Sequence, residues 1–215
     1  FDGWNSIHFV PETVFAGLSD FTLVSLPMFV IMGAAVASSR AGSDLYEALA
    51  RWLHRVPGSL VTSNIGACAL FSALTGSSPA TCAAIGKMGI PEMRKRGYDA
   101  DLATGAIAAG GTLGILIPPS VVLVIYAILT EQNIAKLFLA AFVPGLLAAL
   151  GYMIVIAVYA RLRPQDVGSL PPRPMKDRIA ATIKVWPVMV IFLVVVGGIY
   201  TGLFTPTEGA AIGAF

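Results

Sequence analysis

Long apolar runs separated by short charged segments dominate the chain. Residues 21–39, 134–159 and 185–203 each approach or exceed the roughly 20 mostly apolar residues that carry a helix across a bilayer. We therefore predict three crossing helices at these positions. A fourth apolar segment, residues 99–129, is longer than one crossing needs, but glycines and prolines interrupt it near its middle.

The segments on either side of the first crossing have different patterns. Residues 1–9 carry a Trp and a His, which is typical of a membrane interface, and residues 11–18 favour a short helix with a proline in its first turn. After the crossing, the large apolar residues of 42–56 (Leu45, Leu49, Trp52, Leu53 and Val56) fall on one helical face and most charged residues fall elsewhere. This amphipathic helix either lies along the membrane surface or packs against the protein as part of a loop.

Residues 59–93 form one apolar zone that is interrupted by the sequence TGSSPAT at 75–81 and flanked by basic residues on both sides. A single crossing would place these basic flanks on opposite sides of the membrane, and two crossings would need roughly 40 residues. The pattern therefore predicts a re-entrant helical hairpin with arms of about a dozen residues each and its tip at mid-membrane. Irregular backbone at that depth must be enclosed by protein or by a watery cavity, so the tip indicates a site. Close packing of small residues is the alternative interpretation.

The segment 99–129 predicts a helix that is broken near mid-membrane. The run GGTLGILIPP ends at Pro118 and Pro119, which remove a backbone donor and disfavour helical geometry at Ile117. A break frees carbonyl oxygens, and a bound cation is one partner that satisfies them. An ordinary proline kink, completed by neighbouring hydroxyl groups, is the alternative.

Composition agrees with a membrane protein. Of the 215 residues, 56% are hydrophobic and 12% are charged, whereas about a quarter are charged in an average soluble domain. The net charge of +2 gives no reason to expect a nucleic-acid partner. Cys68 and Cys82 lie in apolar segments without metal-ligand spacing, which indicates buried thiols, and the proline-rich basic segment 160–184 indicates a cytoplasmic loop. Because the chain begins with Phe1 and ends within an apolar run, we expect it to be a piece of a longer protein.

Three stretches together closely resemble the large membrane subunit of tripartite ATP-independent periplasmic (TRAP) transporters: GSSPATCAAIGKMGIPEMRKRGYD, GGTLGILIPPSVVLVIYAI and GGIYTGLFTPTEGAAIGA. The likeness runs along nearly the whole chain. It implies an all-α membrane protein of multispanning helices, with a re-entrant helical hairpin and a broken transmembrane helix, that forms one inverted repeat of an elevator-type ion transporter. Pro79 departs from the family, which often has a small or branched aliphatic residue there.

The resemblance also implies a function, which is sodium-coupled secondary import of a carboxylate, such as a C4-dicarboxylate or sialic acid, across the bacterial inner membrane. The implied partners are a small TRAP membrane subunit, a periplasmic substrate-binding protein, the carboxylate substrate and the lipid bilayer. The implied cofactor is a sodium ion, without an organic cofactor and without enzymatic activity.

Carried over position by position, the resemblance places sodium between the hairpin tip and the broken helix, with the substrate beside it. Neutral oxygen ligands suit sodium, and the positive end of the second hairpin arm suits a carboxylate. The implied sodium ligands, mostly through backbone carbonyls, are Ser77, Ser78, Gly111, Thr112, Gly114, Ile117 and Pro118. The implied substrate-binding residues are Thr75, Gly76, Ser77, Ser78, Thr81, Pro119 and Ser120.

These interpretations divide the chain into three parts. Residues 1–58 supply a scaffold helix and a membrane-surface arm helix, and residues 59–133 supply the transport unit, made of the hairpin 59–93 and the broken helix 99–129. Residues 134–215 supply scaffold crossings, the loop 160–184 and the start of the second half of the transporter.

Other functions fit parts of the pattern. A passive anion channel subunit is the main alternative, because re-entrant loops also build selectivity filters. An intramembrane hydrolase would need a base beside Ser77 or Ser78, but Lys87 lies roughly 13 Å along the arm, and both histidines lie outside the apolar segments. A membrane scaffold without transport is a third possibility.

Overall fold

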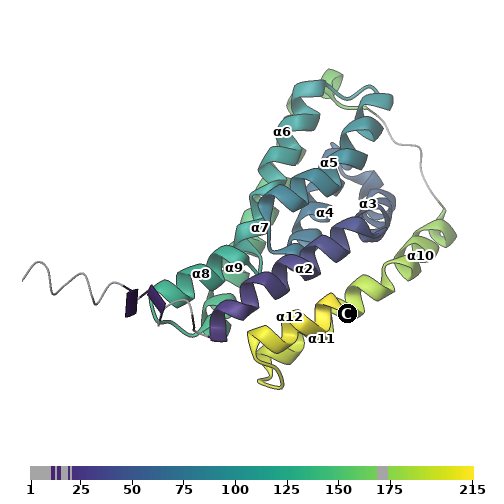
Figure 1. The fold of residues 1–215 in the computed structure, drawn as a ribbon. Helices are drawn as coiled ribbons and strands as arrows, with labels where there is room; N and C mark the ends of the chain where they lie inside the picture. The colour runs from purple at the N-terminus through teal and green to yellow at the C-terminus, as the bar shows by residue number, and fades with distance from the viewer. Residues whose placement is uncertain (1–10, 13, 16–18, 20, 169–173) are drawn as a thin grey trace, which may run out of the picture.

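The computed structural model of the chain consists of helices and their connections over the residues that it describes, which are 11–12, 14–15, 19, 21–168 and 174–215 (Figure 1). The described part contains no strand, so the all-α prediction is confirmed. The predicted interfacial stretch 1–9 lies outside the described residues. Of the predicted short helix 11–18, only residues 11, 12, 14 and 15 are described, and all four are helical.

The long helices follow the apolar segments of the sequence. A short 3-10 helix, Phe21–Val24, leads into the first of them. In chain order the helices are α2 Ser25–Ser38, α3 Ala41–Trp52, α4 Ser59–Thr75, α5 Ser78–Lys95, α6 Ala100–Gly111, α7 Leu113–Leu116, α8 Val121–Leu129, α9 Ile134–Leu162, α10 Met175–Lys184, α11 Trp186–Tyr200 and α12 Pro206–Ala214.

The predicted hairpin is formed by α4 and α5, which Gly76 and Ser77 alone separate. Gly76 has a left-handed backbone (φ 59°) and its amide donates to the Ser72 carbonyl, which ends α4. The arms contain 17 and 18 residues, so the predicted length of about a dozen was wrong. Hydroxyl side chains within the arms can donate to a carbonyl of their own helix, as the Ser63 hydroxyl does to the Ser59 carbonyl. The helices therefore continue through these polar residues.

The helices differ in whether they are long and apolar enough to cross a membrane. Within the described residues, α9 is long and apolar enough to cross a membrane alone. The pair α6–α7 with α8, bent by 40°, and the pair α10 with α11, bent by 48°, reach that length only together. The long crossing predicted at 134–159 is therefore confirmed by length and composition, and it extends to Leu162.

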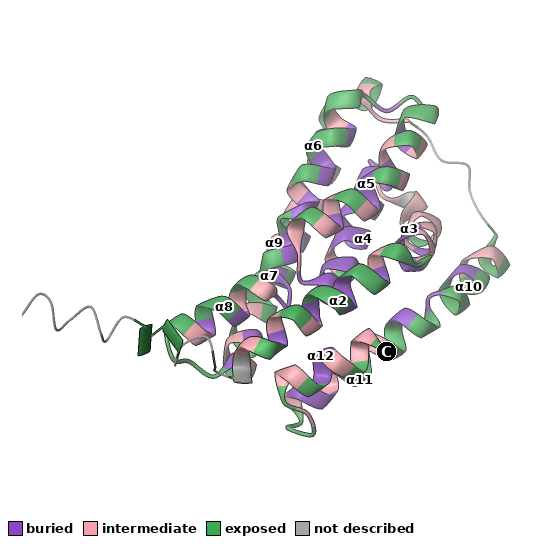
Figure 2. Cartoon of the chain, viewed as in Figure 1, coloured by how far each residue is buried: buried purple, intermediate pink, exposed green. Residues whose placement is uncertain are grey.

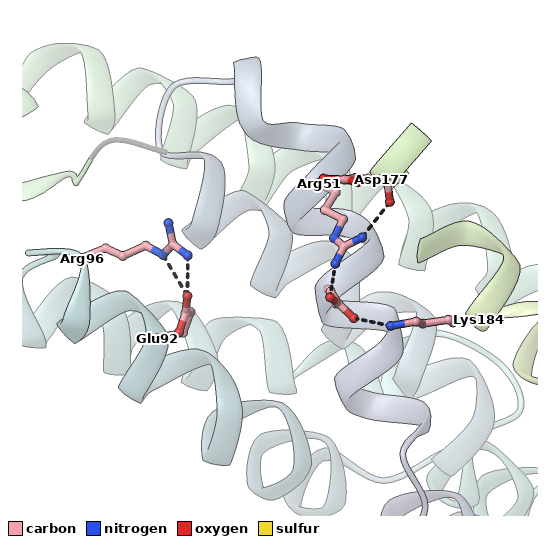
Figure 3. Close-up of polar contacts among 6 residues, drawn as sticks. Arg51, Glu92, Arg96, Asp177 and Lys184 are labelled. Carbon is pink, nitrogen blue, oxygen red and sulfur yellow. Dashed lines mark hydrogen bonds and ion pairs between the residues drawn. The ribbon is translucent and has the colours of Figure 1, made fainter. Parts of the chain in front are cut away.

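The predicted loop at 160–184 is wrong over its last part, because Met175–Lys184 forms α10. This helix buries Ala181 and contacts α3 through side chains that the loop interpretation did not consider. Arg51 donates to the Asp177 carbonyl at 2.7 Å (Figure 3), and the Trp52 indole donates to the Thr182 hydroxyl at 2.8 Å. Pro174 is the N-cap residue of α10.

The amphipathic helix predicted at 42–56 corresponds to α3, and it packs against α4, α5 and α10. Leu45 and Tyr46 are buried, whereas Trp52, placed on the apolar face by its spacing, is 48% exposed. Glu47 links α3 to α10, since its carboxylate pairs with Arg51 of α3 and with Lys184 of α10, the latter at 3.5 Å (Figure 3). In the structure, α3 thus packs against other helices of the protein.

The hairpin's first arm occupies the centre of the molecule. Almost every residue of α4 is buried, and Figure 2 shows it enclosed by its neighbours. A second apolar core joins α2, α8, α9, α11 and α12, where the Phe29 and Phe138 rings meet edge to face with centroids 6.2 Å apart. At the hairpin tip itself, Thr75 and Gly76 are buried, Ser77 and Ser78 are half-buried, and Pro79 is exposed.

Candidate functional site

The hairpin tip and the broken helix, which the sequence marks separately, lie in direct contact. The Val121 amide, at the start of α8, donates to the Gly76 carbonyl at 3.2 Å. Between α7 and α8, residues 117–120 are not helical, and the Pro118–Pro119 peptide bond is cis. The two elements that the sequence analysis assigned to one site are thus in contact, while their roles as ligands stay a prediction.

Glycines make this contact possible. A Cβ atom at Gly76 would lie 2.7 Å from the Pro119 carbonyl oxygen, and one at Gly114 would lie 2.6 Å from the Ser78 amide nitrogen. Both distances are too short for any side chain. The backbones of α7, of the break and of the tip therefore approach one another more closely than other residue types would allow.

Three buried hydroxyl groups hold the two arms together just below the tip. Thr81 shares hydrogen bonds with Thr75 at 3.1 Å and with Ser72 at 3.3 Å, and Thr75 also donates to the Phe71 carbonyl. Thr75 and Thr81 thus lie at the predicted tip, but their hydroxyl groups are bound to each other. Ser72 was missed by the sequence analysis, although its position one helical turn before Thr75 was a usable signal.

A cavity of about 300 Å³ lies at the tip. The Ser78 side-chain oxygen is buried and has no hydrogen-bond partner within the described part of the chain. An unpartnered buried hydroxyl costs free energy unless a ligand or water completes it. The cavity is lined by Thr75, Gly76, Ser77, Ser78, Pro79 and Ala80 of the hairpin, by Val30, Gly33 and Ala34 of α2, and by Ile115, Val121 and Val122 of the broken helix.

The first turn of α5 presents backbone amides near this cavity. The Thr81 amide donates to the Ser77 carbonyl at 3.0 Å, so it is not one of the free amides of this turn. The amides of Ser78 and Ala80 precede the first intrahelical bond, and Pro79 has none to offer. Two amides and the positive end of an 18-residue helix therefore suit an anionic group.

The other predicted ligands lie around the break rather than in the cavity. Gly111 packs against Cys82, because a Cβ there would meet its sulfur. The Thr112 hydroxyl points to α9, where it lies 3.0 Å from the Tyr152 hydroxyl, while donating to Ala109. Ser120 is buried at the N-cap of α8, and Ile117 and Pro118 form the non-helical segment before it.

Helix α2 contributes a wall of the cavity that the sequence analysis did not assign to the site. A Cβ at Gly33 would lie 2.9 Å from the Thr75 carbonyl oxygen, so α2 approaches the tip as closely as backbone allows. The small residues Gly33, Ala34 and Ala35 in an otherwise bulky apolar run were the available signal, since small residues mark close helix contacts in membranes.

The cavity is built from neutral groups. None of its lining residues carries a charge, and no cluster of three His, Cys, Asp or Glu side chains occurs among the described residues. Lys87 and His54 line different cavities, so neither is placed to activate Ser77 or Ser78. Neutral hydroxyl and carbonyl oxygens can replace the water around a monovalent cation without burying a fixed charge.

Comparisons with known proteins show which family the chain belongs to. Residues 3–215 match the family model described as "Tripartite ATP-independent periplasmic transporter, DctM component". The chain is 37% identical over 210 residues to the C4-dicarboxylate TRAP transporter large permease protein DctM of Pseudomonas aeruginosa, covering 98% of this chain and 49% of that protein. It is 32% identical over 213 residues to the sialic acid TRAP transporter permease protein SiaT of Haemophilus influenzae, covering 98% and 34%. It is 30% identical over 212 residues to the ectoine TRAP transporter large permease protein TeaC of Halomonas elongata, covering 98% and 49%.

The fold, the uncharged site and these relatives define a membrane transporter permease subunit and not an enzyme. The chain belongs to the DctM component family of tripartite ATP-independent periplasmic transporters. It spans about half the length or less of the curated relatives reported above. The resemblance seen in the sequence is thereby confirmed.

Proposed function

We propose that this chain supplies one half of the transport site of a sodium-coupled carboxylate importer in the bacterial inner membrane. The observation that carries the proposal is the Ser78 hydroxyl, which is buried and has no partner among the described residues, on a residue that lines the cavity at the tip. A cation could bind to this hydroxyl oxygen. Because Gly114 has no side chain, the backbone of α7 lies close enough to Ser78 to supply further oxygen ligands.

In this proposal, sodium binds first between the tip and the break. Ser77 and Ser78 supply hydroxyl oxygens, while Gly111, Thr112, Gly114, Ile117 and Pro118 supply backbone carbonyls after a small rearrangement. Bound sodium adds positive charge beside the amides at the start of α5, which favours a carboxylate in the same cavity. Each ligand therefore raises the affinity of the other, as coupled transport requires.

The hairpin enters the membrane and returns to the same side in this proposal, and α4–α8 move as one transport unit relative to α9 and α11. A small TRAP membrane subunit and a periplasmic substrate-binding protein complete the transporter. A C4-dicarboxylate is the first substrate to test, because the Pseudomonas aeruginosa relative named for that substrate is 37% identical to this chain.

The decisive experiment combines Ser77→Ala with Ser78→Ala in the full-length permease, assembled with its small subunit and binding protein in proteoliposomes. We expect sodium-dependent uptake to fall at least about tenfold, because each lost oxygen ligand weakens sodium binding. The thermal stability of the complex should be unchanged or raised, since the Ser78 hydroxyl makes no bond within the described protein.

Ser63→Ala is a matched control, because this buried serine of α4 bonds only to the Ser59 carbonyl at 2.6 Å. It should leave uptake intact. Normal uptake by the double variant would overturn the assignment of the tip. Rapid flux down the substrate gradient without sodium would instead support the passive anion channel.

A further inference from the structure

A second polar cavity, of about 400 Å³, lies at the base of the hairpin, between α3 and α5. It is separate from the tip site, since the two cavities share no lining residue. Its volume falls within the range of small-molecule sites. The polar side chains that line it include Tyr46, Glu47, Arg51, His54, Glu92 and Arg96.

The Tyr46 side chain is buried, and its hydroxyl group lacks a hydrogen-bond partner among the described residues. This side chain is 8% exposed, and it lines the cavity. Burial, and then the nearby Glu92 carboxylate, raise the pKa of Tyr46 above its ordinary value. The hydroxyl is therefore protonated and available to donate a hydrogen bond.

The charged side chains around Tyr46 differ in which of their hydrogen-bonding atoms already have a partner. Both terminal guanidinium nitrogens of Arg51 have partners, since Nη1 donates to the Asp177 carbonyl and Nη2 pairs with Glu47. In contrast, a single Glu92 oxygen, Oε1, accepts both bonds of Arg96, from Nε at 2.8 Å and from Nη2 at 2.7 Å (Figure 3). Among the described residues, Glu92 Oε2 and Arg96 Nη1 have no partner.

This remaining set contains one acceptor with negative charge and two donors, one of them positive. A simple anion would bind the donors but face the carboxylates of Glu47 and Glu92, whereas a zwitterion satisfies both signs. Glu92 Oε2 needs an N–H donor, which a primary ammonium has and a quaternary ammonium lacks. Phosphate oxygens suit Arg96 Nη1 together with the Tyr46 hydroxyl.

We propose that the cavity between α3 and α5 binds a group that carries a phosphate and a primary ammonium, as the headgroup of an aminophospholipid does. The phosphate accepts hydrogen bonds from Tyr46 and Arg96, and the ammonium donates to Glu92. Leu60 and Met88, which also line the cavity, contact the first carbons of the ligand. Such a ligand would brace the arm helix against the base of the hairpin.

The test uses the complete transporter complex, purified and exchanged into membranes with equal parts of phosphatidylethanolamine, phosphatidylglycerol and phosphatidylcholine. Native mass spectrometry then measures which lipid each complex retains. We expect preferential retention of phosphatidylethanolamine by the wild type. Tyr46→Phe and Glu92→Gln should each lower that retention about tenfold, because each removes one bond to a charged group.

Tyr200→Phe is the matched control, because Tyr200 also has a buried hydroxyl without a partner among the described residues but does not line this cavity. It should retain the lipid as the wild type does. In lipid-free detergent, Tyr46→Phe should melt at or above the wild-type temperature, since its hydroxyl makes no bond within the described protein.

A second arm of the test distinguishes a lipid from a soluble ligand. Stabilisation of the detergent-solubilised complex by O-phosphoethanolamine, abolished by Tyr46→Phe, without selective lipid retention would support the site and assign it to a soluble molecule. Equal retention of the three lipids together with no response to O-phosphoethanolamine would overturn the proposal. Undiminished binding by both the Tyr46 and Glu92 variants would do so as well.

Discussion

Two glycines determine how closely the hairpin tip and the broken helix approach each other. Gly76 combines a left-handed backbone with a carbonyl group, that of Pro119, where its side chain would be. Gly114 lies against the backbone of Ser77 and Ser78. A single methyl group at either position would separate the elements that form the cavity, so the geometry of the site depends on residues without side chains.

We expect Gly76→Ala to abolish uptake and to lower the free energy of unfolding by about 1–2 kcal/mol from the left-handed backbone alone, with the clash at Pro119 adding to this loss. Thermal unfolding of the complex and sodium-dependent uptake are the measurements. Gly105→Ala on α6 is the control, because nothing lies within 4 Å of a Cβ there. In that helix interior, alanine should be neutral or stabilise by up to about 1 kcal/mol, with transport preserved. Equal behaviour of the two variants would contradict the role of Gly76.

At the scale of single elements, side-chain caps fix several helix starts. The Asp99 side chain accepts the amides of Asp101 and Leu102 at the start of α6. Asn133 accepts the Lys136 amide at the start of α9. Such caps use residues next to one another in the chain, so the sequence predicts these starts well.

Ser120 has a larger role than a simple cap. Its hydroxyl donates to the Ile115 carbonyl at 3.0 Å and accepts the Leu123 amide at 3.4 Å, so it joins both sides of the break. We expect Ser120→Ala to lower the free energy of unfolding by about 1–2 kcal/mol, because the Ile115 carbonyl and the start of α8 both lose a hydrogen-bond partner. Thermal unfolding measures this change. Thr130→Ala is the comparison, since that exposed hydroxyl bonds only to the Tyr126 carbonyl, and a larger loss there would contradict the prediction.

The start of α12 should depend on pH. Glu208 accepts hydrogen bonds from the Thr205 amide at 2.8 Å and from the Thr205 hydroxyl at 2.9 Å, and these bonds lower the pKa of the Glu208 carboxyl. Because the pKa is lower in the folded protein, the stabilisation is fully present above the ordinary carboxyl pKa. It is lost as the pH falls through the folded pKa.

The test compares Glu208→Gln with the wild type. The wild type should melt at a higher temperature near neutral pH, and the difference should shrink between roughly pH 6 and pH 3 as the carboxyl group becomes protonated. A difference that stayed constant over this range would show that the carboxylate charge contributes nothing to the cap.

At the scale of the whole molecule, α9 lies beside the proposed transport unit. Gly145 of α9 meets Leu116 and Ile117 at the break, and Ala160 meets Gly58 at the hairpin base, where the two Cβ positions would be 3.1 Å apart. These contacts join the proposed moving and fixed parts of the transporter. If the unit moves, they must separate during each cycle.

We expect a disulfide between Gly58→Cys and Ala160→Cys to stop transport while leaving the complex assembled. The Cβ atoms are close enough for a disulfide after slight relaxation. Cys68 and Cys82 are first replaced by alanine so that no other thiol competes. Uptake is then measured in oxidised and reduced vesicles, with each single cysteine variant as a control. Reduction should restore uptake, whereas full activity of the oxidised protein would show that α9 and the hairpin base do not separate.

The sequence by itself determined the all-helical class of the protein and the position of several main elements. The apolar runs predicted α9, and the interruptions at TGSSPAT and GGTLGILIPP predicted the hairpin and the break, because hydroxyl-rich turns and paired prolines act on the backbone locally. It could not predict α10, since that helix packs on α3 through residues more than 120 positions away.

Only the tertiary structure decided which polar atoms of the site remain without a hydrogen-bond partner among the described residues. Thr75, Thr81 and Ser78 look alike in the sequence, yet packing pairs the first two with each other and leaves the Ser78 hydroxyl without a partner among the described residues. The same holds for Gly33, which becomes part of the cavity because α2 lies across the tip. Hydrogen bonding between helices depends on distances that local patterns do not contain, so residue type gave the candidates and packing chose among them.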